Sequence, residues 1–180
     1  GVSPQEILAI TFTNKAAGEM KERVLDLVGN KAKLMQVSTF HSACVRFLRA
    51  DAQKLGRSST FSIYDSQDSL RLITMVAAGL EINSKVLSPR SLAAQISNAK
   101  SELIDHETYM SRAESEQERL VGQVYSEYDQ RLARANAFDF DDLIGATVAL
   151  LQLFPDIKQK FRHRFKHILV DEYQDTNHAQ

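Results

Sequence analysis

The sequence predicts an α/β protein that is mostly helical, in which an incomplete parallel sheet is interrupted by a large all-helical insertion. Three observations lead to this prediction. Short apolar runs alternate with segments of helical periodicity at the start of the chain, and purely helical periodicity fills its middle. Near the end, an apolar run returns and leads directly into two acidic residues. Alternating strands and helices are typical of a parallel sheet, and the 180 residues suit one domain or slightly more.

The first strand is predicted over residues 7–12, an apolar run rich in strand formers. Such a run is typical of a strand that is buried on both faces of a parallel sheet. Thr13 and Asn14 offer capping side chains, and apolar residues recur at helical spacing over residues 15–28. Gly29 is expected to end this helix.

A second strand is predicted over residues 34–37, followed by a helix that begins at Ser38 and Thr39 and continues through Leu48. A hydroxyl side chain at the start of a helix can accept a hydrogen bond from a free backbone N–H group. The first part of the chain therefore repeats the order strand, helix, strand, helix.

The middle of the chain, about residues 66–135, has few β-branched runs and a helical periodicity. Pro89 follows a capping serine and suits the first position of a helix. Helices are predicted over about residues 66–79, 88–103 and 120–132. The acidic run within this region is expected to be a solvated helical face.

The α/β character returns with helices predicted over residues 139–153 and from Pro155 onward, before a strand at residues 168–170. Residues 158–166 contain five lysines or arginines and no acid. A solvated helix face is the favoured interpretation of this basic run, and contact with DNA phosphates is the alternative.

The bulk composition limits the possible classes of protein. The net charge of −1 gives no general attraction to nucleic acid, so any such contact must be local. A single cysteine, Cys44, excludes an internal disulfide and favours a cytoplasmic location. The apolar runs are too short to span a bilayer, so no membrane partner is expected. Both ends are expected to be cuts within a longer protein, because the chain opens without Met directly before a strand.

The most informative chemistry lies where the last predicted strand ends in Asp171 and Glu172. Open parallel sheets bind ligands beyond the carboxyl ends of their strands. There, Asp171 can hold Mg²⁺ through carboxylate oxygen, and Glu172 can orient and deprotonate a water that attacks a γ-phosphate. The pattern by itself leaves open a plain acidic strand end that faces solvent.

The complete run Ile-Leu-Val-Asp-Glu-Tyr-Gln-Asp-Thr-Asn at residues 168–177 resembles the Walker B motif, or motif II, of superfamily 1A DNA helicases of the UvrD/PcrA/Rep type. Residues 9–20 resemble motif Ia of that family, and residues 38–42 resemble motif Ib. Residues 138–143, Phe-Asp-Phe-Asp-Asp-Leu, are similar to a further family segment before motif II. Four matches in the family order, near both ends of the chain, exclude coincidence.

The resemblance implies two RecA-like motor domains of the P-loop NTPase class, each with a helical insertion. Residues 1–40 and 161–180 would belong to the first motor domain, 1A. Residues 41–160 would be mainly its helical subdomain, 1B, with the connecting helices. The implied activity is ATP-dependent unwinding of duplex DNA, 3′ to 5′, in repair or replication. The cofactors would be ATP and Mg²⁺, and the partners would be single-stranded DNA, single-strand/duplex junctions and repair or replication proteins.

Six residues are implied as DNA contacts: Phe12, Thr13, Asn14, Lys15, Thr39 and His41. In the family, the aromatic residue of motif Ia stacks on a base, a contact worth about 1–3 kcal/mol that tolerates any sequence. Without that context, Phe12 would be read as a core residue. Thr39 and His41 would meet a phosphate at a helix start, where free N–H groups suit an anion.

The resemblance assigns Asp171, Glu172 and Gln174 to the catalytic and nucleotide-binding site. Asp171 would hold the magnesium ion, Glu172 would act on the attacking water, and Gln174 would link the nucleotide site to neighbouring motifs.

The phosphate-binding loop Gly-x-x-x-x-Gly-Lys-[Ser/Thr] does not occur, because no pair among the seven glycines has its spacing. The chain alone is therefore expected to be inactive as an ATPase and to bind neither ATP nor Mg²⁺ tightly. Its sheet is expected to have an exposed edge. Two alternatives remain open: a non-catalytic module that binds DNA or protein, and part of a helicase-nuclease subunit.

Overall fold

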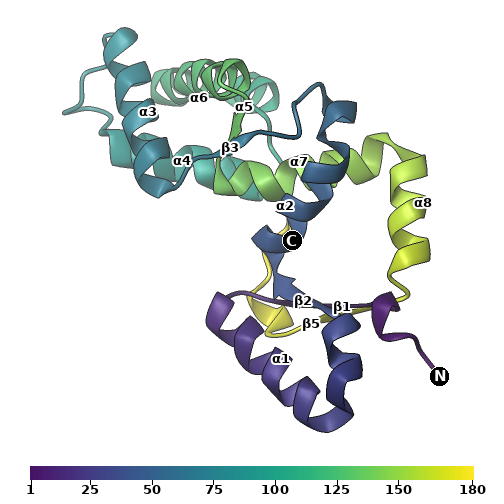
Figure 1. Ribbon diagram of the computed structural model, residues 1–180. Helices are drawn as coiled ribbons and strands as arrows, with labels where there is room; N and C mark the ends of the chain where they lie inside the picture. The colour runs from purple at the N-terminus through teal and green to yellow at the C-terminus, as the bar shows by residue number, and fades with distance from the viewer.

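The computed structural model describes residues 1–180, which form a small parallel sheet with helices on both faces and a helical lobe beyond it (Figure 1). The sheet has the strand order β2-β1-β5. Its strands are β1 (Ile7–Thr11), β2 (Gln36–Thr39) and β5 (His167–Val170). Thr11 lies opposite Thr39, and Ile10 lies opposite Val170. The carboxyl ends of all three strands therefore meet at one edge of the sheet.

Helices from both ends of the chain cover the two faces of this sheet. Helix α1 (Asn14–Val28) lies on one face, and α2 (Phe40–Asp51) rises from the other (Figure 1). Two later helices, α7 (Phe140–Leu153) and α8 (Pro155–Arg164), return the chain to β5. Short 3₁₀ segments complete this part of the fold: η1 (Pro4–Glu6), η2 (Gly29–Leu34), η3 (Ala52–Leu55) and η4 (Tyr173–Asp175).

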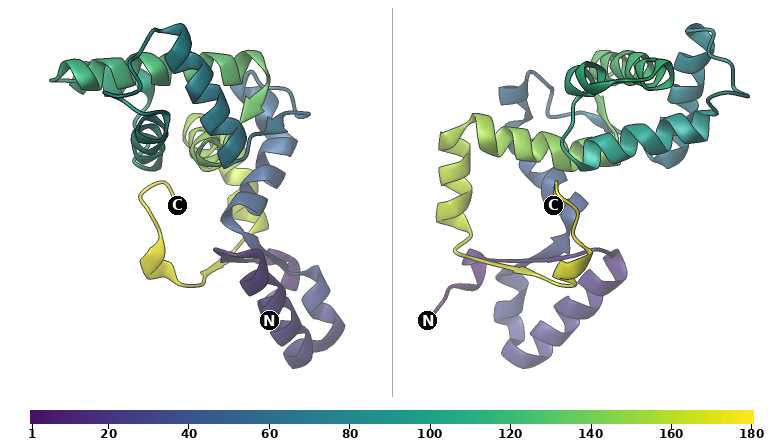
Figure 2. Two further views of the ribbon diagram at one scale, coloured as in Figure 1. Left: turned by 90° about the vertical axis from the view of Figure 1, so that its left-hand side faces the viewer. Right: turned by 180° about the vertical axis from the view of Figure 1, so that it is seen from behind.

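The helical lobe is built from four helices between α2 and α7, as both turned views show (Figure 2). They are α3 (Ser66–Gly79), α4 (Pro89–Ser101), α5 (His106–Arg112) and α6 (Glu116–Arg134). A two-stranded parallel sheet, β3 (Ser62–Ile63) with β4 (Ala137–Phe138), joins the points where the chain enters and leaves the lobe. The C-terminal residues run back beside α4, where the Ala179 N–H donates to the carbonyl of Ser101 at 3.1 Å.

Two separate apolar cores hold the molecule together. The first packs the sheet against α2, α7 and α8, and Leu48, Phe61 and Leu150 are among its fully buried members. The second fills the helical lobe and includes Val76, Val124 and other side chains of α3, α4 and α6. Each fully buried Leu or Phe side chain contributes roughly 1.5–3 kcal/mol relative to exposure, so each core stabilises its own part of the fold.

The α/β class and the helical excess predicted from the sequence are confirmed, and most helices lie where periodicity placed them. Two predicted boundaries were wrong, and one helix was not predicted. The helix predicted to reach Leu103 ends at Ser101, because Leu103 adopts a left-handed conformation with φ +57°. A separate helix, α5, follows this break. The second strand begins at Gln36 rather than at residue 34, because Gly29–Leu34 form a 3₁₀ helix.

The strand β5 lies at one side of the sheet and has a free edge. Ile168 and Leu169 on this strand are 60% and 57% exposed, although they belong to an apolar run. Central strands of a parallel sheet are normally covered on both faces.

No helix of the chain combines the length and the apolarity needed to cross a membrane.

Candidate nucleic-acid and nucleotide sites

A cavity of 690 Å³ opens at the carboxyl ends of β1 and β2. Because the two strands are parallel and in register, the residues that follow Thr11 and those that follow Thr39 come out side by side. The cavity is lined by Phe12, Thr13, Asn14, Thr39, His41, Ser42, Val45, Arg46, Ile63, Phe140 and Leu143. The structure thus brings together five of the six residues predicted to contact DNA.

The amino ends of two helices open onto this cavity. The Thr13 hydroxyl caps α1 by accepting from the Ala16 N–H at 3.1 Å, and the Thr39 hydroxyl caps α2 by accepting from the Ser42 N–H at 3.2 Å. The first N–H groups of a helix lack partners within the helix and carry the positive end of its dipole. Two such ends beside one cavity form a favourable place for a phosphate group.

Aromatic side chains line the cavity on two sides. Phe12 is half-buried and lies 5.4 Å from the ring of the buried Phe40. Phe140, which is 44% exposed, meets the His41 ring edge-on at 5.5 Å. Exposed aromatic faces of this kind can stack on nucleic-acid bases.

Sequence reasoning did not single out Phe140 as a contact. The available signal was its place in the Phe138–Leu143 segment, immediately after the helix cap Asp139. Phe140 lies beside His41 because α7 packs against α2, and hydrophobic periodicity alone does not predict which helices pack together.

Charge is sparse within the cavity. Arg46 is the only lysine or arginine that lines it. Burial lowers the pKa of His41, so its ring is neutral at pH 7 and can donate one hydrogen bond. Lys15, the sixth predicted DNA contact, does not line the cavity. Its side chain is 87% exposed on the first turn of α1, 3.9 Å from Glu19.

The acidic residues lie at the same edge of the sheet, one strand further along. The Asp171 N–H donates to the carbonyl of Ile10 at 2.9 Å, which extends the β1–β5 pairing by one residue. The Asp171 carboxylate accepts from the Glu172 N–H at 3.1 Å. The Gln174 side-chain amide donates to the Glu172 carboxylate. The three predicted nucleotide-site residues are therefore adjacent.

Glu172 adopts a left-handed conformation with φ +51°. For a residue with a side chain, such a conformation costs about 1–3 kcal/mol and persists where the surrounding structure imposes it. The turn directs the chain from β5 into η4, so Asp171 and Glu172 both stay exposed at the strand end.

The end of β5 carries side chains of the chemical type that binds a magnesium ion. Mg²⁺ prefers oxygen ligands and is usually held by one or two carboxylates together with substrate phosphates and water. Asp171 and Glu172 offer exposed carboxylate oxygens of this kind. The chain itself provides no glycine-rich loop to hold the phosphates.

The structure is that of an α/β protein in which exposed carboxylates and the N-termini of two helices lie at the same edge of a parallel sheet. A family model described as the UvrD/REP helicase N-terminal domain matches residues 1–180. The chain therefore belongs to the UvrD/REP helicase family.

Individual relatives agree with this assignment. The chain is 59% identical over 184 residues to the ATP-dependent DNA helicase UvrD1 of Mycobacterium tuberculosis, a match that covers 100% of the chain and 24% of the relative. It is 54% identical to UvrD1 of Mycobacterium leprae, over 99% of the chain and 24% of the relative. It is 46% identical to the ATP-dependent DNA helicase PcrA of Staphylococcus aureus, also over 99% of the chain and 24% of the relative. The chain thus spans about a quarter of the length of these relatives.

Proposed function

We propose that this chain is part of the first motor domain of an ATP-dependent DNA helicase or translocase. Residues 1–40 and 161–180 would belong to its RecA-like sheet domain, and residues 41–160 to its helical subdomain with the connecting helices. Family membership and the helicase names of its relatives support this proposal. Because the chain spans a quarter of those relatives, the activity would belong to a longer protein.

The observation that carries the DNA-binding part of the proposal is the cavity at the ends of β1 and β2. Two helix N-termini there favour phosphates, while Phe12 and Phe140 offer faces for bases. Neither feature reads a base sequence. That combination suits a protein that moves along single-stranded DNA of any sequence.

The acidic residues would serve the nucleotide. When bound, ATP with Mg²⁺ supplies the phosphate bond whose hydrolysis drives movement. The Asp171 carboxylate would hold the metal, and the Glu172 carboxylate would orient the attacking water and take its proton. Gln174 would position Glu172 through the amide hydrogen bond between them.

The pairing of β1 with β5 offers a short route between the two sites. The Asp171 N–H is hydrogen-bonded to the Ile10 carbonyl, and Phe12 follows Ile10 by two residues, directly after the end of β1. A shift of the acidic turn would therefore move the wall of the proposed DNA cavity.

The rest of the proposal concerns the longer protein. It would unwind duplex DNA from 3′ to 5′ and bind at single-strand/duplex junctions. It would also contact repair or replication proteins and be located in the cytoplasm.

By itself, this chain is best described as a DNA-binding module without catalysis. It contains no loop to cradle the phosphates, so Asp171 and Glu172 would have no anchored substrate. The purified chain should show no magnesium-dependent ATP hydrolysis. Turnover that is abolished by Glu172→Gln would overturn this part of the proposal.

Fluorescence anisotropy with a labelled oligothymidylate tests the DNA-binding part. Phe12→Ala should weaken binding by about 5- to 150-fold, equivalent to the loss of one base stack of about 1–3 kcal/mol. Phe154→Ala is the matched control, because both phenylalanines are partly buried against the same core but Phe154 lies outside the cavity. Equal binding by the two variants, or affinity that does not change with salt, would exclude this cavity as the DNA site.

A further inference from the structure

The dipeptide Thr-Phe stands at the carboxyl end of both β1 and β2. Thr11 lies opposite Thr39 in the parallel pairing of the two strands. Phe12 and Phe40 follow these threonines and therefore occupy equivalent places. Their rings pack together, with centroids 5.4 Å apart and ring planes at 58°. Their environments differ, because Phe40 is buried in the core whereas Phe12 lines the proposed DNA cavity.

The environment of Phe40 follows from the hydrogen bond of the threonine before it. The Thr39 hydroxyl accepts from the Ser42 N–H at 3.2 Å and so caps α2. Helix α2 therefore begins at Phe40, with no residue between it and β2. The ring of a residue in this first helical position turns into the core of the sheet domain.

The Thr11 hydroxyl makes a different bond. It donates to the carbonyl of Thr13 at 3.1 Å, across Phe12. Thr13, and not Thr11, caps α1. Phe12 therefore lies outside both β1 and α1, in a turn that the Thr11 hydroxyl closes. Local bonds between a threonine side chain and the backbone compete with helical hydrogen bonds and favour such turns.

This hydroxyl is well placed to hold the turn. Thr11 is 1% exposed, so its side chain is shielded from water. The Thr13 carbonyl also accepts from the Ala17 N–H at 3.0 Å, in the first turn of α1. Without the hydroxyl, that carbonyl would keep its helical partner, so no buried acceptor would be left unpaired. Loss of the hydroxyl should therefore loosen the turn and leave the fold intact.

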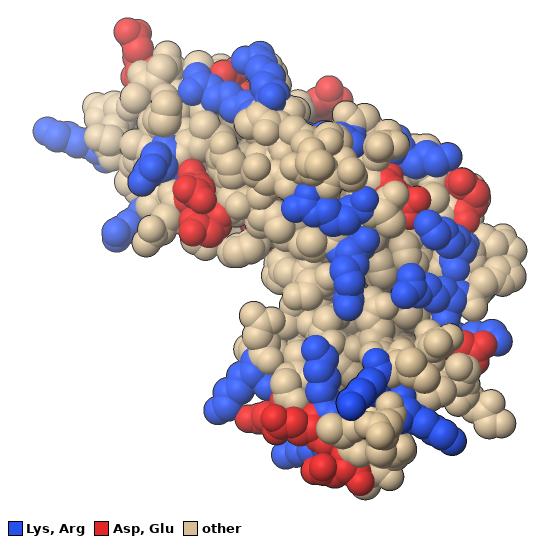
Figure 3. Space-filling model, viewed as in Figure 1, with Lys and Arg blue, Asp and Glu red and all other residues tan.

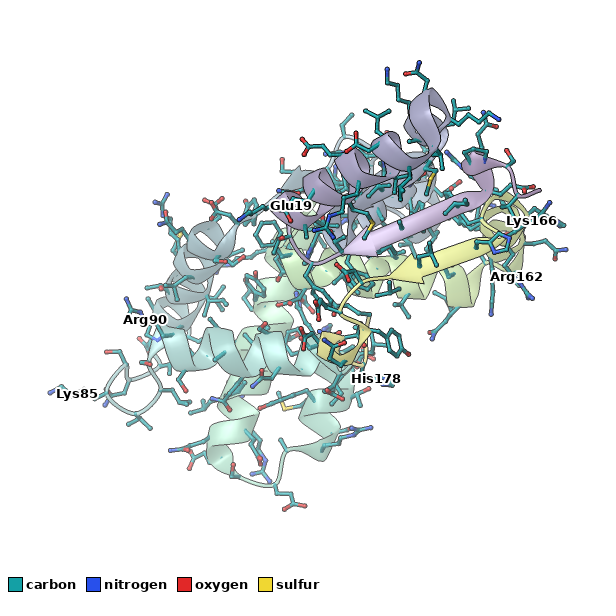
Figure 4. All side chains as sticks on the ribbon, turned by 90° about the horizontal axis from the view of Figure 1, so that it is seen from below. Glu19, Lys85, Arg90, Arg162, Lys166 and His178 are labelled. Atoms are coloured by element: carbon teal, nitrogen blue, oxygen red, sulfur yellow. The ribbon has the colours of Figure 1, made fainter.

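The proposed DNA cavity relies on its aromatic rings more than on charge. Arg46 is the only lysine or arginine that lines it. On the left of Figure 3 the surface is hollowed between the helical lobe and the sheet, and most side chains seen there are uncharged. In Figure 4, β1 runs from the end marked by Lys166 toward the first turns of α1, near Glu19. The turn that carries Phe12 lies at this second end of the strand.

We propose that Thr11 is a positioning residue for DNA binding, whose hydrogen bond to the Thr13 carbonyl holds the Phe12 ring at the cavity. This inference rests on the proposed function. Thr11 would touch no part of the DNA, because its side chain is buried and does not line the cavity. It would act through Phe12 by fixing the turn that carries the ring. A ring held in place before DNA arrives loses less conformational freedom on binding.

The test compares variants that differ in one hydroxyl. Thr11→Val removes the hydroxyl and keeps the branched shape of the side chain, and Thr11→Ser keeps the hydroxyl. Thr147→Val is the matched control, because Thr147 is also buried and its hydroxyl donates to the carbonyl of Leu143 at 2.8 Å. Thr147 does not line the cavity. Fluorescence anisotropy measures binding of a labelled oligothymidylate, and urea unfolding checks that each variant is folded.

Thr11→Val should weaken binding about tenfold, a part of the loss expected when a whole base stack is removed. Thr11→Ser and Thr147→Val should stay within about twofold of the native chain. The slope of log affinity against log salt should not change in Thr11→Val, because no phosphate contact is lost. Equal binding by Thr11→Val and Thr147→Val, or an equal loss in Thr11→Ser, would overturn the inference.

A double-mutant cycle separates positioning from a general loosening of the fold. In a chain that already carries Phe12→Ala, Thr11→Val should change binding by no more than about twofold, because no ring is left to position. A second tenfold loss in that background would show that Thr11 acts on another part of the chain, against the inference. If Thr11→Val does not fold, Thr11→Ala should bind about tenfold more weakly than Thr11→Ser, and equal binding by these two would overturn the inference.

Two outcomes separate this inference from the proposed function. If Phe12→Ala leaves oligothymidylate binding unchanged, the proposed DNA cavity is wrong and the inference falls with it. If Phe12→Ala weakens binding but Thr11→Val does not, the cavity stands and only the positioning role of Thr11 is wrong.

Discussion

The Nζ atom of Lys100 lies 2.9 Å from Oδ2 of Asp139, where helix α4 of the lobe meets the amino end of α7. The same ammonium group lies 2.7 Å from Asp142 and 3.1 Å from Asp129 on α6. The Lys100 side chain is only 6% exposed. One buried ammonium group thus contacts one carboxylate on α6 and two at the start of α7. It links the helical lobe to α7, the helix that leads back toward the sheet.

Lys100→Met should destabilise the chain by roughly 3–5 kcal/mol, because loss of one partner leaves buried carboxylates without a counter-charge. Methionine keeps most of the length and the apolar stem of lysine. Lys85→Met is the control, since Lys85 is exposed and forms no ion pair. Unfolding in urea measures both variants, and equal midpoints would show that Lys100 does not hold the lobe in place.

The hydroxyl of Tyr128 donates to Asp139 Oδ2 at 2.9 Å inside this cluster, whereas the hydroxyl of Tyr125 donates to the backbone carbonyl of Ile104 at the same distance. A hydrogen bond to a charged acceptor contributes about 1.5–3 kcal/mol, and one to a neutral acceptor about 0.5–1.5 kcal/mol. Tyr128→Phe should therefore lower the free energy of unfolding more than Tyr125→Phe. The opposite order in urea unfolding would mean that Asp139 carries little charge.

Stability should depend on pH through Asp142. Burial, together with the neighbouring carboxylates of Asp139 and Asp129, raises the pKa of Asp142 from 3.8 to about 7, although Lys100 opposes this. The folded state then binds a proton more tightly than the unfolded state, so this contribution is present below about pH 4 and is lost as the pH rises toward 7. Asp139 acts in the opposite sense. Its pKa is lowered, since Lys100 and its hydrogen bonds outweigh burial, so its contribution is lost as the pH falls below 3.8.

Asp142→Asn isolates the Asp142 contribution, because an amide cannot titrate. The difference in unfolding free energy between the native chain and this variant should shrink from pH 5 to pH 7.5. Urea unfolding at several pH values between these limits gives that difference. A difference that stays constant would show that Asp142 is ionised throughout.

This cluster also marks a limit of the sequence prediction. Periodicity located α4, α6 and α7, because each helix carries an apolar stripe long enough to detect. It gave no reason to bury Lys100, whose carboxylate partners lie 29 to 42 positions away in sequence. Strands β3 and β4 were missed for a similar reason, since two residues are too few to show an alternating pattern.

The centre of the cavity at the ends of β1 and β2 was indicated by the sequence, and its rim was not. The resemblance to motifs Ia and Ib singled out Phe12, Thr13 and Thr39, and in the structure these residues lie at the ends of two strands that pair in parallel. Arg46 and Ile63 reach the same cavity only through the packing of α2 and the path of the chain into the lobe. The local sequence around these two residues has no pattern that would have indicated that packing.

Leu103 sits in a left-handed conformation, φ +57°, just after α4, where the Ile104 N–H donates to the carbonyl of Ala99 at 2.9 Å. A glycine is the usual residue at this position of a helix end, because a side chain there costs roughly 1–2 kcal/mol. Leu103 is 37% exposed, so its loss removes part of an apolar contact. Leu103→Gly should therefore stabilise the chain by up to about 1 kcal/mol.

Leu80→Gly is the matched control for this last change. Leu80 follows the end of α3, is 41% exposed and has φ −92°, a conformation that leucine adopts without strain. Glycine there adds only freedom to the unfolded chain, so the control should lose about 0.5–1 kcal/mol. Thermal and urea unfolding of the two variants should shift in opposite directions. A loss of stability in both would mean that the side-chain contacts of Leu103 outweigh the strain of its backbone.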